Sequence, residues 1–206
     1  MASIGLINYG QGNVASVRNA LEFLGQEVEE VSTGNELDRA THLILPGVGA
    51  FAAVMKRLGE CDLAEGLLRQ VREKGKWLLG ICAGMQVLGS VGREFGSHPG
   101  LGLIEGSVDL IPAGEQGLPV PHMGWNELAL HRPSRLFAEL PEHPCFYFVH
   151  SYELRPDDGG AISASCDYGG RITAGIERDN VFGVQFHPEK SQRDGLQLLR
   201  NFCDLN

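Results

Sequence analysis

The sequence predicts an α/β protein with a mostly parallel central sheet, flanked by helices and extended by antiparallel strands in its C-terminal half. Two observations support this prediction. In the first half, short apolar runs rich in Ile, Leu and Val alternate with longer segments of helical period, as in βαβ units around a buried parallel sheet. From Gly102 onward, strand-like runs are separated by Pro and Gly turns, as in hairpins added to such a sheet.

These patterns predict the following elements in chain order. Strands are expected at Ser3–Asn8, Glu27–Val31, His42–Leu45 and Trp77–Ile81, and helices at Val14–Leu24, Ala50–Leu58 and Leu63–Lys74. The second half is expected to hold strands at Leu103–Ile111, Glu127–Leu130, Cys145–Leu154, Ala161–Cys166, Arg171–Glu177 and Val181–Gln185, then a helix at Gln192–Cys203. The Gly- and Pro-rich segment Pro112–Pro121 is expected to be a loop.

Length and composition favour one domain over residues 1–206. The chain has 206 residues, of which 43% are hydrophobic, enough for one large core without metal or disulfide links. The longest nearly apolar run, Trp77 to Gly89, is too short to cross a bilayer, and the N-terminus lacks the basic start of a secretory signal. These features predict a soluble, cytoplasmic protein that does not act at a membrane.

Charge and cysteine content argue against several classes of function. A net charge of −9 without a basic face argues against nucleic acid as a partner. The five cysteines are widely spaced and form no C-x-x-C pair or Cys/His cluster, so neither a disulfide framework nor a metal site is expected. The Gly10-x-Gly12 pair lacks the third glycine of a dinucleotide site, because Ala15 stands there. No cofactor is therefore expected.

The most informative segment is Trp77-Leu-Leu-Gly-Ile-Cys-Ala-Gly-Met-Gln86. An apolar strand enters a turn of small residues, and an apolar helix is expected directly after Cys82. Gly80 and Gly84 flank Cys82 at the two positions where a side chain would crowd the sharp turn of a nucleophile elbow. A helix N-terminus also favours the thiolate, the reactive form of cysteine. Taken alone, the segment is equally consistent with a small buried cysteine in a strand.

Two other segments supply complementary groups. In Phe182-Gly-Val-Gln-Phe-His-Pro-Glu-Lys190, Pro188 keeps His187 extended, so His187 and Glu189 can project on the same side. His187 can then accept a thiol proton while Glu189 orients its imidazole. The segment His42-Leu-Ile-Leu-Pro-Gly-Val-Gly-Ala-Phe51 ends a strand with glycines, whose N–H groups could turn toward a developing oxyanion.

Together, the three segments resemble the signature of class-I glutamine amidotransferases: a glycine-rich oxyanion strand, a Gly-x-Cys-x-Gly-x-Gln elbow and a distal His-Pro-Glu. The resemblance implies the class-I amidotransferase fold and glutamine as the substrate. It also implies a catalytic triad, in which the Cys82 thiolate attacks the side-chain amide, His187 moves protons and Glu189 holds the imidazole.

Further motifs narrow the resemblance to one group of that family. They are Asn8-Tyr-Gly-Gln-Gly-Asn13, Pro46-Gly-Val-Gly-Ala-Phe51, Pro121-His-Met-Gly-Trp-Asn126, Tyr147-Phe-Val-His-Ser-Tyr152 and Phe186-His-Pro-Glu-Lys-Ser191. From Ile4 to Phe202 the chain looks like the glutaminase subunits of imidazole glycerol phosphate synthases. One departure is Ala83, where this group usually has Leu. Because that position contributes mainly its backbone N–H, the chemistry should be unaffected.

The resemblance also implies roles around the nucleophile. Backbone groups of Val48 or Gly49 and of Ala83 would form the oxyanion hole. Glutamine would be held by a second set of residues: Gly47, Gln86, Glu94 and the backbone of Ser151 and Tyr152. The Glu94 assignment depends only on counting positions after Gln86, and a solvated surface glutamate is equally consistent with the sequence.

Trp125, Tyr147 and Lys190 lie in runs that, in this group, face the synthase subunit where ammonia crosses. The implied partner is a (β/α)8-barrel cyclase that uses the ammonia in histidine biosynthesis. Two other interpretations remain open: a cysteine hydrolase of similar architecture, such as a γ-glutamyl peptidase, and an inactive regulatory subunit, which would need a missing nucleophile or base. The sequence also leaves open whether the chain serves another ammonia-using synthase.

Overall fold

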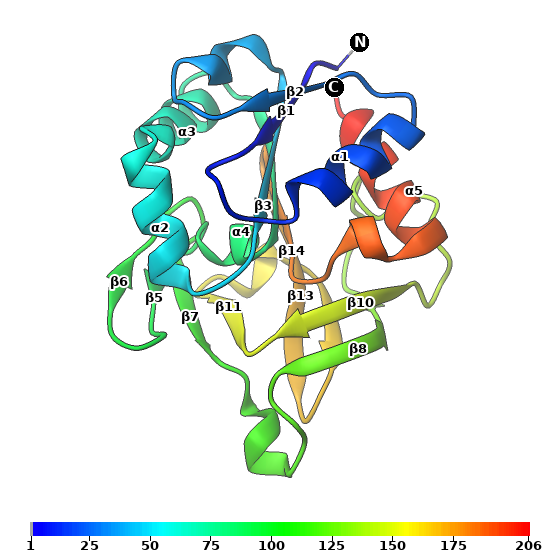
Figure 1. The fold of residues 1–206 in the computed structure, drawn as a ribbon. Helices are drawn as coiled ribbons and strands as arrows, with labels where there is room; N and C mark the ends of the chain where they lie inside the picture. Colours follow the sequence, from blue (N-terminus) through cyan, green and yellow to red (C-terminus); the bar gives the residue numbers. More distant parts are fainter. Residues whose placement is uncertain (1) are drawn as a thin grey trace.

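The computed structural model describes residues 2–206 and has a central eight-stranded sheet (Figure 1). The strand order is β2-β1-β3-β4-β14-β13-β12-β9. The parallel strands are β1 (Ile4–Ile7), β2 (Val28–Val31), β3 (His42–Gly47), β4 (Trp77–Cys82) and β14 (Val181–Val184). The antiparallel additions are β13 (Arg171–Arg178), β12 (Ile162–Asp167) and β9 (Ala129–Leu130). The predicted α/β class with a mostly parallel sheet is confirmed.

Helices cover both faces of the sheet. Helices α1 (Val14–Phe23) and α5 (Gln192–Cys203) lie on one face, and α2 (Phe51–Glu60) and α3 (Leu63–Arg72) lie on the other (Figure 1). Each helix buries one apolar stripe, so the core consists of two hydrophobic clusters, one on each side of the sheet. The parallel strands β1, β3, β4 and β14 are buried on both faces, which explains why they read as continuous apolar runs, whereas the edge strand β2 exposes Glu29 and Glu30.

The second half differs from the prediction in its strand pairing. Two smaller sheets form in addition to the central one. One pairs β8 (His122–Glu127) with β10 (Cys145–His150), and the other has the order β11-β7-β5-β6, formed by Tyr152–Pro156, Gly106–Leu110, Val91–Gly92 and His98–Pro99. The single strand expected at Cys145–Leu154 is therefore broken at Ser151, because β10 and β11 pair with different partners.

Short 3₁₀ turns complete the structure: η1 (Glu36–Arg39), η2 (Pro112–Gln116), η3 (Gly159–Ala161) and η4 (Pro188–Lys190). The η2 turn lies in the segment expected to be a loop. Within residues 2–206, no helix combines the length and the apolar composition that crossing a bilayer requires.

The helix expected after Cys82 begins there but lasts only one turn, α4 (Ala83–Gln86). It stops because the carbonyls that would continue it bond elsewhere. The N–H of Leu101 donates to Val87 O (2.8 Å), and the N–H groups of Leu103 and Ile104 donate to Leu88 O (2.9 and 3.0 Å). The chain after the elbow is thus fixed by a distant loop rather than by its own helix.

The turn at Cys82 packs directly against β3. A Cβ atom added at Gly84 would lie 1.9 Å from Leu45 O, and one added at Gly47 would lie 2.2 Å from Gly84 N. Real Cβ atoms do not approach backbone so closely, so these two positions accept only glycine. The sequence feature that predicted an elbow therefore reflects contact between backbones.

Replacing Gly84 with alanine is expected to destabilise the fold by at least about 1–3 kcal/mol, because the added methyl group would meet the backbone of β3. Gly59→Ala is the matched control, since its Cβ would have no atom within 4 Å and alanine is favoured over glycine inside a helix such as α2. Urea unfolding followed by circular dichroism measures both changes. Equal stability of Gly84→Ala and the unmodified protein would contradict the close approach.

Candidate active site

Three neighbouring parallel strands bring the candidate segments to one edge of the sheet. Strand β4 lies between β3 and β14, with Gly47 opposite Cys82 and Val184 opposite Ile81. His187 follows shortly after β14. Open α/β sheets bind ligands at the carboxyl ends of their strands, so this edge is the expected place for a site.

Cys82 has the backbone geometry of a nucleophile elbow. Its φ and ψ are 55° and −115°, a conformation that costs a non-glycine residue about 1–3 kcal/mol. The Cys82 sulfur lies 3.9 Å from Val149 O and 3.7 Å from Gln185 Nε2. Because α4 is a single turn, its dipole would give a thiolate at this position little support.

His187 is held by a buried carboxylate. Its Nδ1 lies 2.9 Å from Glu189 Oε1, which also accepts a hydrogen bond of 2.8 Å from Asn13 Nδ2. The His187 and Glu189 side chains are only 2% and 0% exposed. Within residues 2–206, His187 Nε2 has no partner of ordinary hydrogen-bond geometry, which leaves this nitrogen free to act.

The charges of this group support one another. Burial lowers the pKa of His187, but hydrogen bonding and charge from Cys82 and Glu189 outweigh burial and raise its pKa to about 9. Burial raises the pKa of Glu189, but the bond and charge of His187, together with the Asn13 amide, hold its pKa below the ordinary value. Near neutral pH, the raised pKa of His187 and the lowered pKa of Glu189 therefore favour an imidazolium beside a carboxylate.

The Cys82 side chain lines a cavity of about 280 Å³, a volume near the small end of the range for ligand sites. Its lining is formed by Val48, Gly49, Cys82, Ala83, Gln86, Glu94, Val149, His150, Ser151, Tyr152 and His187. All but two of the residues predicted for catalysis, oxyanion binding and glutamine binding thus meet at one cavity. The exceptions are Glu189, which lies behind His187, and Gly47, which packs against Ala83 and Gly84.

The structure gives Glu94 and Gln86 defined positions in the cavity wall. Glu94 Oε2 accepts a hydrogen bond of 2.9 Å from the N–H of Phe51, the first residue of α2, so this side chain is anchored rather than freely solvated. Gln86 is buried and donates to Tyr152 O (2.8 Å) and to Gln185 Oε1 (3.0 Å). Both side chains are therefore fixed before any ligand binds.

The glycine-rich strand lies beside the thiol and is held by Tyr9. The buried Tyr9 hydroxyl donates to Pro46 O at 3.0 Å. Burial raises the Tyr9 pKa and the nearby Cys82 raises it further, whereas the Val48 N–H beside the hydroxyl opposes the rise. Gly49 follows with φ of 93°. The Val48 N–H thus lies close to Tyr9.

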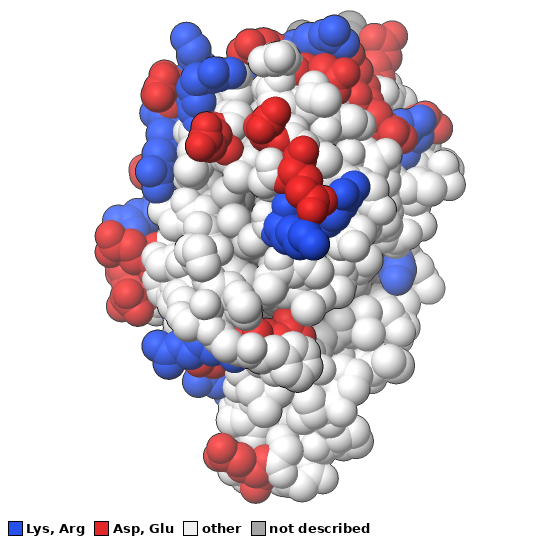
Figure 2. All heavy atoms as spheres, turned by 60° about the vertical axis from the view of Figure 1, so that its left-hand side comes forward, with Lys and Arg blue, Asp and Glu red and all other residues white. Residues whose placement is uncertain are grey.

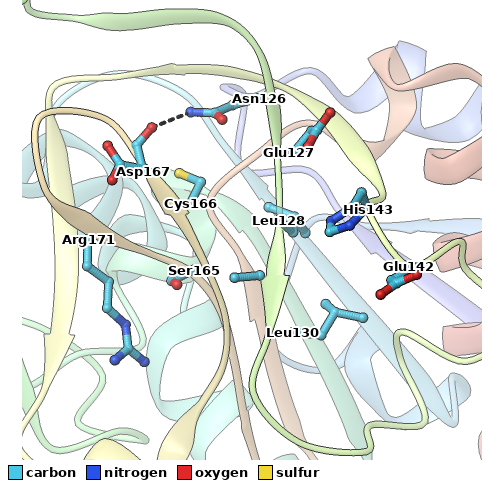
Figure 3. Close-up of a pocket in the computed structure, with 11 residues that line it drawn as sticks. Asn126, Glu127, Leu128, Leu130, Glu142, His143, Ser165, Cys166, Asp167 and Arg171 are labelled. Atoms are coloured by element: carbon cyan, nitrogen blue, oxygen red, sulfur yellow. Dashed lines mark hydrogen bonds between the residues drawn. The ribbon is translucent and has the colours of Figure 1, made fainter.

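A larger hollow, of about 810 Å³, lies between the β8–β9 segment and β12 (Figure 3). It has a cysteine, Cys166, but burial and then nearby acidic side chains raise the pKa of that thiol to about 12. A thiol of this kind is inert near neutral pH. Among residues 2–206, no group of three or more His, Cys, Asp or Glu side chains lies close enough together to hold a metal ion.

The three residues predicted to face a partner subunit form one cluster. The rings of Trp125 and Tyr147 are 6.0 Å apart in an edge-to-face arrangement, and Lys190 Nζ lies 5.9 Å from the Tyr147 ring. The backbone of Tyr147 also accepts a bond of 2.9 Å from the N–H of His187. This surface cluster is therefore joined directly to the segment that carries the histidine.

Several residues of the site received no role from the sequence. Asn13 binds Glu189, Gln185 contacts the Cys82 sulfur, and Tyr9 holds the glycine-rich strand. Asn13 and Gln185 stand inside the motifs that carried the resemblance, but nothing in the local pattern indicates which distant side chain each would meet. His150, which lines the cavity, also received no role.

Comparison with known proteins identifies the family. The model of the family described as "Glutamine amidotransferase class-I" matches residues 5–205. Two relatives, both named "Imidazole glycerol phosphate synthase subunit HisH", come from Moorella thermoacetica and Desulfitobacterium hafniense. The first is 46% identical over 100% of this chain and 96% of its own length, and the second is 47% identical over 97% and 92%.

Solved structures agree on the fold. One described as "Crystal structure of glutamine amidotransferase" matches with a TM-score of 0.76 at 23% identity, over 97% of this chain and 96% of that one. PurLQS from Thermotoga maritima matches with a TM-score of 0.74 at 21% identity, over 98% of both chains. The chain therefore belongs to the class-I glutamine amidotransferases and, within that family, to the group of imidazole glycerol phosphate synthase HisH subunits.

Proposed function

We propose that this chain hydrolyses glutamine with Cys82, His187 and Glu189 and passes the ammonia to the cyclase subunit of an imidazole glycerol phosphate synthase. The observation that carries the proposal is the strained Cys82 elbow, which opens into a cavity beside a histidine held by a buried carboxylate. The proposal includes a single amidotransferase domain over residues 1–206 and a cytoplasmic location.

The first half of the reaction forms a thioester. The Cys82 thiolate attacks the side-chain amide carbon of glutamine, and the Ala83 N–H, with that of Val48 or Gly49, stabilises the oxyanion. The His187 imidazolium then gives its proton to the departing nitrogen, and ammonia leaves. His187 is suited to this step because its pKa of about 9 keeps it protonated while the thiolate attacks.

The second half of the reaction releases glutamate. His187, now neutral, takes a proton from water, which attacks the thioester carbon and expels the Cys82 thiolate. Glu189 stays ionised throughout and holds the imidazole in the useful tautomer. This cycle regenerates the imidazolium–thiolate pair without any further group.

Fixed polar groups in the cavity wall suit the rest of the glutamine molecule. The Glu94 carboxylate is anchored through one oxygen to α2, which leaves its other oxygen for the α-ammonium group. Ser151 and Tyr152 also line the cavity, and their backbone groups can bind the α-carboxylate and amide groups. Gly47 lies under the elbow, so its contribution would be to position Ala83 rather than to touch glutamine.

The proposed docking surface for the cyclase surrounds the cluster of Trp125, Tyr147 and Lys190. Exposed apolar side chains continue it along β7 and β8, where Leu110 and Met123 are 54% and 61% exposed. Figure 2 shows that, on the side it presents, charged side chains are fewer on the lower half of the molecule than on the upper half, although an acidic group stands at the lower tip. Exposed apolar side chains such as Leu110 and Met123 suit a stable subunit interface.

Replacing Cys82 with alanine is expected to abolish glutamine-dependent synthesis by the assembled enzyme but to leave synthesis from ammonium salts, because the cyclase needs only the nitrogen nucleophile. Cys61→Ala, at the end of α2, is the control and should retain both activities. Product formation from each nitrogen source measures the effect. Glutamine hydrolysis that survives in Cys82→Ala would reject the proposed nucleophile.

The activity should fall as pH rises through about 9, because His187 must be protonated to release ammonia and its pKa is raised to about 9. Glu189→Gln removes one charge that raises this pKa, so the falling limb of kcat/KM should move to lower pH.

His187→Asn should cost more activity than Glu189→Gln, and the two losses should not add in the double variant. An unmoved falling limb in Glu189→Gln, or fully additive losses, would argue that the two side chains do not act as a unit.

The isolated chain is expected to be nearly inactive on glutamine and to become active when the cyclase docks with its own ligand bound. Val48 stands between two glycines with its N–H near the Tyr9 hydroxyl, so the peptide would have to rotate to present an oxyanion donor to the cavity. Such a donor accounts for about 10²–10³ in rate. Glutaminase rates are compared for the chain alone, with the cyclase, and with the cyclase plus its nucleotide ligand. Three similar rates would exclude the gate but not the proposed triad.

A further inference from the structure

Two buried histidines beside the cavity have no part in the reaction described above. His122 on β8 and His150 on β10 lie directly opposite each other in the two-stranded sheet and are 2% and 6% exposed. The His122 ring is stacked between Phe148 and Tyr168, with centroid distances of 4.7 and 4.0 Å. Burying an imidazole ring in this way costs free energy unless both of its nitrogens form hydrogen bonds. The partners of the His122 and His150 nitrogens are therefore informative.

The two rings belong to one hydrogen-bonded chain that ends at the cavity. Asn126 Nδ2 lies 3.3 Å from His122 Nε2, and His122 Nδ1 lies 3.1 Å from His150 Nε2. His150 Nδ1 then lies 2.9 Å from Tyr152 O. Tyr152 O also accepts a bond of 2.8 Å from Gln86 Nε2, so this carbonyl is fixed by two donors.

This hydrogen-bonded series of side chains has only one consistent arrangement of its protons. A carbonyl oxygen accepts, so His150 Nδ1 must carry a proton, and in a neutral ring its Nε2 is then an acceptor. His122 Nδ1 must therefore donate to His150, which leaves His122 Nε2 to accept from the Asn126 amide. The second N–H of that amide donates to Asp167 O at 2.9 Å, as Figure 3 shows at the rim of the larger hollow. Along the path from Asn126 through His122 and His150 to Tyr152 O, each donor therefore points toward the cavity that Cys82 lines.

Electrostatics agrees with two neutral rings. Burial lowers the pKa of His122 to about 4. Burial also lowers the pKa of His150 to about 4; the Tyr152 carbonyl opposes this, and the neighbouring His122 and His187 add to it. Both imidazoles therefore stay uncharged near neutral pH, which keeps the direction of the chain fixed and adds no positive charge beside the His187 imidazolium.

We infer that His122 and His150 are positioning residues for glutamine: the chain of donors that begins at Asn126 fixes the Tyr152 carbonyl, and with it the Ser151–Tyr152 backbone that lines the cavity. This inference rests on the proposed function, because the ligand it concerns is the glutamine of that reaction. The chain passes from one small sheet to the other at Ser151, where Ser151 O accepts a bond of 2.9 Å from the N–H of Ile111 and Tyr152 pairs with Leu110. The two histidines add a further constraint at Tyr152 O, which they hold together with Gln86.

The experiment measures kcat and KM for glutamine in the assembled synthase. His122→Phe keeps an aromatic ring between Phe148 and Tyr168 but removes the donor to His150, and His150→Leu removes the donor to Tyr152 O. Each should raise KM for glutamine about tenfold, the effect of losing one buried hydrogen bond, while kcat changes little. His150→Asn can place an amide N–H near the position of Nδ1 and should restore much of the affinity. The control is His131→Phe, since His131 bonds Ser165 outside the cavity.

Two further readouts separate positioning from general damage. Melting temperature and synthesis from ammonium salts should stay close to those of the unmodified enzyme, and ¹⁵N NMR of the histidine rings should report two neutral Nδ1–H tautomers. An unchanged KM in His122→Phe and His150→Leu, a fall in kcat alone, or an imidazolium at either position near pH 7 would overturn the inference. An unmodified enzyme that hydrolyses no glutamine would instead reject the proposed function, and this inference with it.

Discussion

The contact between the backbone of the elbow and the backbone of β3 is the constraint on which the rest of the site depends. Gly84 and Gly47 allow the two segments to meet, and this contact keeps Cys82 in a conformation that an isolated chain would leave. The same contact sets the thiol beside the glycine-rich strand, because Gly47 and Cys82 are paired in register. Any side chain at these glycines would move both the proposed nucleophile, Cys82, and the proposed oxyanion donors.

The electrostatics of the site depends on segments that are remote in sequence. A buried carboxylate beside a buried imidazole is costly to desolvate, and the structure offsets that cost with the Asn13 amide and with the pairing itself. Asn13 comes from the loop after β1, Glu189 from the turn after β14, and Cys82 from β4. Three segments at one edge of the sheet therefore share a single network, and removing any member would leave an unpaired group.

The sequence was sufficient for those features that depend on local pattern. The strands β3 and β4 were predicted because they are buried on both faces and read as apolar runs, and the helix at Gln192–Cys203 has the predicted bounds. The carboxyl-edge rule for parallel sheets indicated a site at the end of the glycine-rich strand, and the family resemblance joined Val48 with Cys82 and His187. Glu94 could be assigned only by its distance from Gln86, yet it does line the cavity.

Features set by long-range pairing could not be predicted in the same way. The strand break at Ser151 depends on β10 and β11 choosing partners in different sheets, and no local signal marks that choice. The length of α4 depends on Leu101, Leu103 and Ile104 bonding the carbonyls that would extend the helix. Similarly, Gly47 was grouped with the glutamine-binding residues because it lies in the motif, whereas its backbone packs under the elbow.

The single turn of α4 also has a consequence for how the protein matures. A short helix that owes its shape to residues some fifteen positions later and to a neighbouring strand cannot form on its own, since an isolated turn is unstable in water. The geometry of the proposed nucleophile therefore requires those long-range contacts to be formed. A newly made or partly unfolded chain lacks this geometry at Cys82, so glutamine hydrolysis through the proposed triad is confined to molecules whose folding is complete.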